Sequence, residues 1–379
     1  NGSQWPYHPL ARGFDEYYGH TAGHWGEYFD PPLEHDGKMV RGMGYIVDLC
    51  TDRAIDFIER QRSRPFLCYI PFTTPHSPWA VPDVYWRRFK DKAITQRGSR
   101  GEQEAIDETR CALAMVENQG WNVGRVLRRL DELKLRDNTI VLYFSDNGPN
   151  SWRWNGGMKG RKGSVDEGGV RSPLFVRWPG RITPGTIVSE IAGAIDLLPT
   201  LTVMAGVPWK AEKPLDGLDL SRVLVRSVEM WPERTVFSHW NGRTSVGTQR
   251  YRLDDHGGLF DMIDDPGQTR DISGLEPEVA LRLSRAVLDW REEVISSYRA
   301  ARSGARAGQL PPDDRPFPVG YTEFPWTPLP ARDGVPHGGV RRSSGAPNCS
   351  YFVDWRSIDG RMTWDIEVHT PGIYSVVID

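Results

Sequence analysis

An acidic and an amide side chain, Asp146 and Asn147, directly follow a short apolar segment. That segment, residues 140–144 (IVLYF), has the composition of a strand buried on both faces of a parallel sheet. Open α/β sheets bind ligands just beyond the carboxyl ends of their strands. Carboxylate and amide oxygens are hard ligands that suit Ca²⁺ or Mg²⁺. Two interpretations are open for this pair, a metal site or a simple Asp-Asn-Gly turn.

A glycine-rich loop with three cationic residues comes next. Its cations are Lys159, Arg161 and Lys162, and glycines stand among them at positions 156, 157, 160 and 163. Glycine lets a backbone approach an anion closely, and a lysine supplies a point charge for that anion. Because the loop directly follows the Asp-Asn pair, we favour a ligand site over a turn for residues 139–173.

A histidine with proline neighbours is a third candidate. His76 lies in the sequence Thr-Pro-His-Ser-Pro, just past the apolar segment 66–72 (FLCYIPF). A histidine on a loop stiffened by prolines suits a proton donor in catalysis. The alternative is a histidine packed in an ordinary turn, and these residues alone do not separate the two.

The spacing of apolar residues predicts the elements that position these side chains. We expect strands at 66–72 and 140–144, joined by a long helix over 102–135. A strand, a crossover helix and a second strand form a right-handed parallel unit. This topology predicts that His76 and Asp146 lie at the same edge of one sheet.

Further elements follow from the same patterns. The remaining predicted elements are helices at 45–60, 191–205 and 277–301 and strands at 174–178, 235–240, 249–253 and 258–262. The last three strands are expected to be antiparallel and, with the final helix, to form a small α+β subdomain. Beyond it, Asp359-Gly360 predicts a hairpin between strands at 351–355 and 362–368, with one more strand at 373–378.

These elements predict four parts of the chain. They are a partial α/β domain (1–233), an α+β subdomain (234–304), a proline-rich linker (305–336) and an incomplete β-rich module (337–379). The length of 379 residues allows two or three domains, and the net charge of −3 argues neither for nor against a nucleic-acid partner. The four cysteines have no metal-type spacing, and no apolar run is long enough to span a bilayer. Without an initiator Met or signal peptide, the chain is expected to be a piece of a longer protein.

Several segments, in order, resemble formylglycine-dependent sulfatases of the arylsulfatase type, in the alkaline-phosphatase superfamily. The segments are Arg12–Tyr17 (RGFDEY), Thr74–Pro78 (TPHSP), Ser145–Gly148 (SDNG), Gly163–Pro173 (GSVDEGGVRSP) and Asp196–Leu201 (DLLPTL). The resemblance covers roughly residues 5–300. It implies an α/β fold with a mixed or parallel sheet flanked by helices, followed by the α+β subdomain and the start of a β module.

The resemblance also implies roles for individual residues. Asp146 and Asn147 correspond to Ca²⁺ ligands, and Lys162 corresponds to the lysine that contacts the substrate's sulfate. Lys159 is the alternative lysine, but Lys162 immediately precedes Gly-Ser and matches better. His76 corresponds to the residue that contacts sulfate and protonates the leaving alcohol. Two further residues are expected to line the pocket, His239 and Trp152.

One departure from the family concerns the nucleophile. The family forms formylglycine from Cys or Ser in a C/S-x-P-x-R motif, and this sequence contains neither form of it. An Asp pair that completes the family's metal site is also missing. We therefore expect these parts in a missing N-terminal segment and the chain alone to be inactive. The alternatives are a phosphodiesterase or phosphonate hydrolase of the same superfamily, or a non-catalytic carbohydrate-binding protein. The family implies aryl or carbohydrate sulfate esters as substrates and a periplasmic or secreted location, and leaves the oligomeric state open.

Overall fold

A computed structural model describes residues 5–20, 27–208, 210, 212–226, 231–300, 316–324, 326–343 and 350–378, with the side chains of 296–300 excepted. The chain forms two compact units. Unit 1 contains residues 1–92, 110–133 and 313–379, and unit 2 contains residues 93–109 and 134–312. The predicted boundaries of the four parts stay predictions. No helix in the described segments is long and apolar enough to cross a membrane.

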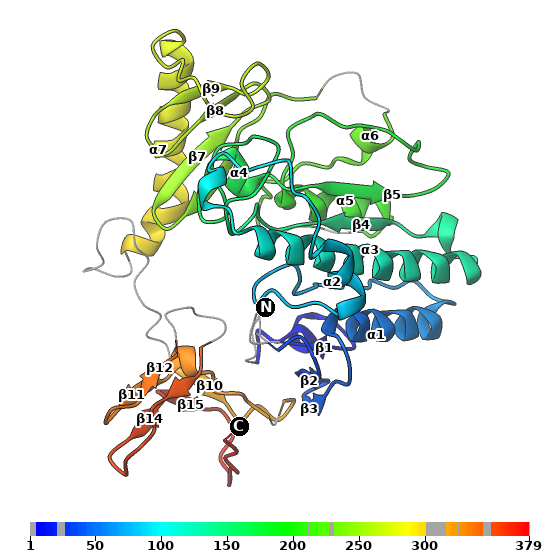
Figure 1. The fold of residues 1–379 in the computed structure, drawn as a ribbon, viewed down its shortest axis with the longest axis vertical. Coiled ribbons are helices and arrows are strands. Elements are labelled where there is room, and N and C mark those ends of the chain that lie inside the picture. Colours follow the sequence, from blue (N-terminus) through cyan, green and yellow to red (C-terminus); the bar gives the residue numbers. More distant parts are fainter. Residues whose placement is uncertain are drawn as a thin grey trace. The chain divides into compact units, whose positions relative to one another are not determined.

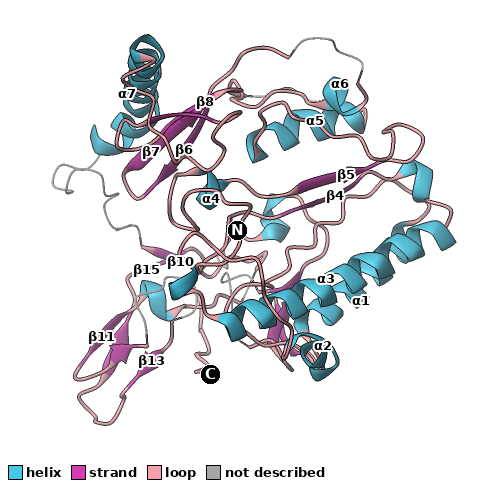
Figure 2. Ribbon diagram, turned by 45° about the horizontal axis from the view of Figure 1, so that its top comes forward, coloured by secondary structure: helices cyan, strands magenta, loops and turns pink. Residues whose placement is uncertain are grey.

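Unit 1 is built on two long helices and a small antiparallel sheet. Helix α1 (Ile46–Gln61) lies beside α3 (Ile106–Glu132), as both views of the ribbon show (Figures 1 and 2). The sheet has the order β1 (Tyr18–Gly19), β2 (Pro32–His35) and β3 (Lys38–Arg41). The buried core of unit 1 contains Tyr28, Leu33, Tyr45, Ile46, Val47, Cys111 and Met115. Both helices confirm predictions made from apolar spacing, although α3 begins four residues later than expected.

The predicted strand at 66–72 is wrong. These residues form no strand in the structure, and helix α2 (Asp83–Phe89) is the next element of the chain. Leu67 and Tyr69 are 70% and 57% exposed, so alternate side chains face away from the unit. An apolar run becomes a buried strand only where neighbouring strands accept its hydrogen bonds, and none in the described residues pairs with this one.

The strand before the Asp-Asn pair exists, but its surroundings differ from the prediction. β4 (Val141–Phe144) pairs antiparallel with β5 (Leu174–Arg177), and Figure 2 shows them as an adjacent pair. The predicted burial on both faces is also wrong, because β4 is only half-buried and Phe144 is exposed. The loop between the strands explains the direction. Its ends are joined by a hydrogen bond from the Ser172 hydroxyl to the Ser145 carbonyl, so the chain returns beside the strand that it left.

Unit 2 also contains the four-stranded sheet predicted as antiparallel. Its order is β6 (Val236–Trp240), β7 (Arg243–Gly247), β8 (Tyr251–Leu253) and β9 (Leu259–Asp261). Helix α7 (Pro277–Ala300) packs on β7 and β8 through Leu283, Val246 and Leu253 (Figure 1). The antiparallel subdomain and its helix are thus confirmed. Strand β7 was missed, although Asn241-Gly242 is a strong hairpin signal.

Short helices complete unit 2. They are α4 (Glu167–Val170), α5 (Leu197–Met204) and α6 (Ser221–Leu224). The helix predicted over 191–205 is shorter than expected, and a 3₁₀ turn at Ala194–Asp196 precedes it. Asp196 is fully buried and pairs with Arg234 at 2.9 Å. This residue of the DLLPTL segment therefore has a structural role.

The C-terminal part of unit 1 differs from the predicted hairpin. Its strands are β10 (Phe317–Val319), β11 (Val335–His337), β12 (Arg341–Arg342), β13 (Phe352–Val353), β14 (Arg361–Thr363) and β15 (Ile366–Val368). They form three two-stranded sheets, β10–β15, β11–β14 and β12–β13. The predicted strand 362–368 is interrupted because the Trp364 indole donates to the Pro330 carbonyl at 3.0 Å and packs on Phe352.

Two further predictions on this part are corrected. The proline-rich linker is structured where it is described, since it includes β10 and most of β11, whereas residues 305–315 lie outside the described residues. No strand forms over 373–378. Ile373 and Val376 there are fully and 85% exposed, so these two apolar side chains are not buried by any described residue.

Candidate functional site

The Asp-Asn pair sits at the start of a tightly closed loop in unit 2. The next residue, Gly148, donates its amide to the Gly169 carbonyl at 3.1 Å. A Cβ at Gly148 would lie 1.9 Å from the Gly168 carbonyl oxygen, so only glycine fits there. The Lys162 amide donates to the Pro149 carbonyl at 2.8 Å. The backbone therefore brings Lys162 beside Pro149, two residues after Asn147, whereas the shared role of these side chains stays a prediction.

Lys159 and Lys162 have different surroundings. The Lys159 ammonium lies 2.9 Å from the carboxylate of Asp254 and 3.3 Å from that of Asp166, over the Phe260 ring. Burial opposes its charge, but the hydrogen bond to Asp254 and the two carboxylate charges outweigh burial and raise the pKa of Lys159. Lys162 is exposed and has no ion pair with any described residue. Of the two lysines, Lys162 is therefore the one without a carboxylate partner among the described residues, and its contact with sulfate stays a prediction.

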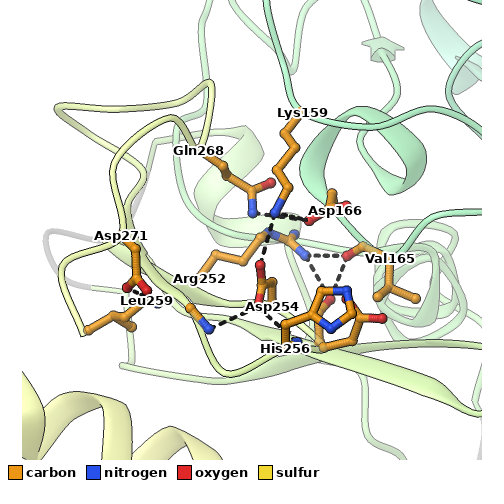
Figure 3. A network of polar contacts seen from close by, with 12 residues as sticks. Lys159, Val165, Asp166, Arg252, Asp254, His256, Leu259, Gln268 and Asp271 are labelled. Atoms are coloured by element: carbon orange, nitrogen blue, oxygen red, sulfur yellow. Dashed lines mark hydrogen bonds and ion pairs between the residues drawn. The ribbon is translucent and has the colours of Figure 1, made fainter. Parts of the chain in front are cut away.

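A polar network ties the glycine-rich loop to the four-stranded sheet (Figure 3). Arg252 on β8 donates to the Val165 carbonyl at 3.1 Å and pairs with Glu167 at 2.8 Å. Ser245 on β7 donates to the same carbonyl at 2.6 Å. Gln268 accepts the Glu167 amide at 2.8 Å. The loop is thus fixed from the next part of the chain, about 80 to 100 residues away in sequence.

The two residues predicted to line the pocket have well-defined positions. Trp152 is half-buried, with the guanidinium groups of Arg161 and Arg100 at 5.1 and 5.6 Å from its ring centroid. His239 on β6 forms a 2.8 Å hydrogen bond with Thr244 and packs against Trp290 of α7. Burial, and secondarily the charge of Arg291, lowers the pKa of His239. The pocket role of both residues stays a prediction.

The His76 loop belongs to unit 1 and is held by two buried side chains. The Tyr28 hydroxyl donates to the His76 carbonyl at 3.0 Å. Gln119 of α3 donates its amide to the hydroxyl of Thr74 at 2.9 Å and also to the Thr74 carbonyl. The His76 Nδ1 lies 2.7 Å from the Ser77 carbonyl, which can only accept, so Nδ1 carries a proton. In the neutral ring Nε2 is therefore the basic nitrogen.

Tyr28 and Gln119 were not identified from the sequence. Tyr28 is 2% exposed and belongs to the core of unit 1. Gln119 is 3% exposed and, with Asn118 and Asn122, forms a run of buried polar residues on α3. A polar cluster on the apolar face of a predicted helix was the available signal, because buried polar groups need partners. The meeting of His76 with Asp146 stays a prediction, since the two residues lie in different units.

The candidate metal ligands form an incomplete set. Asp146 is exposed and Asn147 half-buried, and both offer oxygen donors of the kind that Ca²⁺ binds. Ca²⁺ takes six to eight oxygens, however, and no three His, Cys, Asp or Glu residues of the described segments gather into a metal-binding group. The donor type fits calcium, whereas the number of donors in the described residues does not.

Comparison with known proteins identifies the family. The fold is that of a sulfatase-type α/β protein, and the Sulfatase family model matches residues 1–207, more than half of the chain. The chain therefore belongs to the sulfatase family. It is 28% identical over 324 residues to the steryl-sulfatase of Mus musculus, an alignment that covers 73% of this chain and 47% of that protein. It is 31% identical over 239 residues to the N-acetylgalactosamine-6-sulfatase of Canis lupus familiaris, covering 56% of this chain and 42% of that protein.

A solved structure agrees with this assignment. The crystal structure of Ps i-CgsB superposes with a TM-score of 0.66 at 25% sequence identity, covering 75% of this chain and 67% of that one. The same protein has been solved in complex with k-i-k-neocarrahexaose. The chain spans about half the length of the curated relatives that it matches. The expected α/β architecture of the alkaline-phosphatase type is thereby confirmed.

Proposed function

We propose that the whole protein is a sulfuric ester hydrolase that acts on carbohydrate sulfates. The observation that carries this proposal is the Sulfatase match over residues 1–207, which includes every candidate site residue except His239 of β6. One relative is named for N-acetylgalactosamine 6-sulfate and another for steryl sulfate, and a similar structure was solved with k-i-k-neocarrahexaose. Aryl sulfates are the alternative substrate class.

Lys162 and His76 carry the proposed substrate contacts. The exposed Lys162 ammonium, which has no ion pair among the described residues, would bind the sulfate and stabilise charge as the S–O bond breaks. In its doubly protonated form, His76 would donate the Nε2 proton to the leaving alcohol oxygen and keep its Nδ1 proton, which is held by the Ser77 carbonyl.

Calcium and formylglycine complete the proposal. Asp146 and Asn147 would hold a Ca²⁺ ion, which would supply Lewis-acid stabilisation of the sulfate oxygens when bound. Two side chains are too few for firm binding, so the 379-residue chain should bind Ca²⁺ weakly. A formylglycine nucleophile would come from a C/S-x-P-x-R motif, and no cysteine or serine of this sequence lies in one. A periplasmic or secreted location is proposed on the same family basis.

The test is an assay of the whole protein and of the 379-residue chain, each co-expressed with a formylglycine-generating enzyme. Both are given Ca²⁺ and either N-acetylgalactosamine 6-sulfate or 4-nitrophenyl sulfate. We expect turnover by the whole protein and none by the chain. Hydrolysis of a phosphate diester to a phosphate monoester and an alcohol, without turnover of either sulfate ester, would favour the phosphodiesterase alternative. A whole protein that binds sulfated sugars without turnover would be a carbohydrate-binding protein.

A further inference from the structure

The hairpin β6–β7 presents two different faces. Directly opposed residues of an antiparallel pair point to the same side of the sheet. The opposed pairs are Ser238 with Ser245, His239 with Thr244, and Trp240 with Arg243. Because side chains alternate along a strand, His239 and Trp240 point to opposite sides.

Contacts show that one side of the hairpin faces helix α7 and the other faces the glycine-rich loop. His239 and Phe237 pack against Trp290 of α7, at centroid distances of 5.9 and 5.3 Å. On the other side, Ser245 donates to the Val165 carbonyl, and Arg243 donates to the Gly163 carbonyl. Trp240 shares this second side with Arg243. Its ring therefore lies on the side of the sheet that carries the glycine-rich loop.

Trp240 is unusual among the aromatic residues of this sheet because it is 60% exposed. The tight turn Asn241-Gly242, with both residues at positive φ, ends the hairpin beside it. Arg291 of α7 donates to the Gly242 carbonyl at 2.8 Å and fixes this end of the hairpin. The hydrogen bond from Arg243 reaches the residue directly after Lys162. An exposed aromatic residue at a fixed hairpin end thus lies opposite Arg243, whose guanidinium contacts the residue that follows Lys162.

We infer that Trp240 is a specificity-determining residue that stacks against the sugar ring of a carbohydrate sulfate. This inference rests on the proposed function and names its substrate class. A pyranose has an apolar face and polar edges, so it suits a single aromatic ring bordered by hydrogen-bond donors. Lys162 supplies charge for the sulfate, and Arg243 supplies donors for hydroxyl or anionic substituents of the same sugar. A steroid or simple aryl ester would leave the donors of Arg243 unused.

Binding to the 379-residue chain tests this inference independently of turnover. The probe is N-acetylgalactosamine 6-sulfate, measured by titration calorimetry against wild type, Trp240→Ala, Trp240→Phe and Trp355→Ala. Trp355 is the matched control, because it is 54% exposed and lies in unit 1. We expect Trp240→Ala to raise Kd about three- to tenfold, the scale of one lost aromatic contact. Trp240→Phe should recover most of the loss, and Trp355→Ala should leave Kd unchanged.

Three outcomes would overturn the inference. They are an unchanged Kd in Trp240→Ala, an equal loss for 4-nitrophenyl sulfate, and a wild-type chain that binds no sugar sulfate at millimolar concentration. Circular dichroism of each variant separates the loss of the Trp240 ring from a loss of the fold. If the chain binds through Trp240 but the whole protein hydrolyses no sulfate ester, the inference stands and the proposed function fails.

Discussion

The two loops that carry candidate site residues are held in different ways. The His76 loop depends on neutral donors, the Tyr28 hydroxyl and the Gln119 amide, both in the buried part of unit 1. The glycine-rich loop of unit 2 depends on charges, with Lys159 between two carboxylates and Arg252 against Glu167. Each arrangement fixes the backbone beside a candidate site residue, His76 in unit 1 and the exposed Lys162 in unit 2.

The difference has a physical consequence. Neutral hydrogen bonds from buried donors are insensitive to salt and to pH near neutrality, and each contributes about 1 kcal/mol. Charged anchors cost desolvation energy and are strongly destabilising when one partner is removed. The two cations that hold the glycine-rich loop, Lys159 and Arg252, are already paired with carboxylates. Lys162, unlike Lys159, therefore has no carboxylate partner among the described residues.

The largest effect on stability is expected at the charged anchor. Arg252→Met leaves the carboxylate of Glu167 largely buried without its main partner and removes donors from Val165, so we expect a loss of about 3 kcal/mol. Arg250→Met is the matched control on the same stretch of chain, since its pair with Asp261 is solvent-exposed on the arginine side. Chemical denaturation of both variants measures the difference. Equal losses would show that the charged network does not hold the loop.

The two loops can also be compared by their contribution to turnover. In an active whole protein, Lys162→Ala and His76→Ala should each lower kcat by about 10²-fold, the scale for one charge-stabilising or acid–base group. Steady-state kinetics with a sugar sulfate measures both variants and their combination. If only one variant loses activity, the prediction that His76 and Lys162 serve a single site is wrong.

The neutral anchor predicts a smaller effect. Gln119→Ala removes the donor from the carbonyl and hydroxyl of Thr74, and we expect about 2 kcal/mol of destabilisation. Gln103→Ala, an exposed glutamine of unit 2, is the control and should change stability little. Thermal unfolding at low and high salt measures both. A marked salt dependence of the Gln119 effect would contradict the neutral character of this anchor.

The smallest effect concerns alkaline pH. The pKa of Lys159 is raised in the folded state, so its stabilisation is fully present below the ordinary lysine pKa, about 10.4, and is lost as pH rises through the folded value. The stability difference between wild type and Lys159→Met should therefore shrink above about pH 10.4. Lys159→Arg keeps the positive charge at high pH, so the stability difference between Lys159→Arg and Lys159→Met should not shrink over the same range. A difference that stays constant up to pH 11.5 would show that the pairing with Asp254 and Asp166 contributes no pH-dependent stability.

The sequence alone was enough to indicate the family of this chain. The order of the RGFDEY, TPHSP, SDNG and GSVDEGGVRSP segments indicated a sulfatase, and the family match confirms it. The apolar spacing of α1, α3 and α7 located these helices because an amphipathic pattern depends only on neighbouring residues. The choice of Lys162 over Lys159 also came from local sequence, from the Gly-Ser that follows it.

Only the tertiary structure decided which segments pair and which side chains anchor them. The direction of β5 against β4 and the unpaired state of residues 66–72 depend on which strands supply hydrogen-bond partners. The anchors Gln119 and Arg252 act on segments about 45 and 87 residues away in sequence. The side of the sheet on which Trp240 lies follows from strand register. Such long-range contacts are set by packing of the whole chain, and no local pattern contains them.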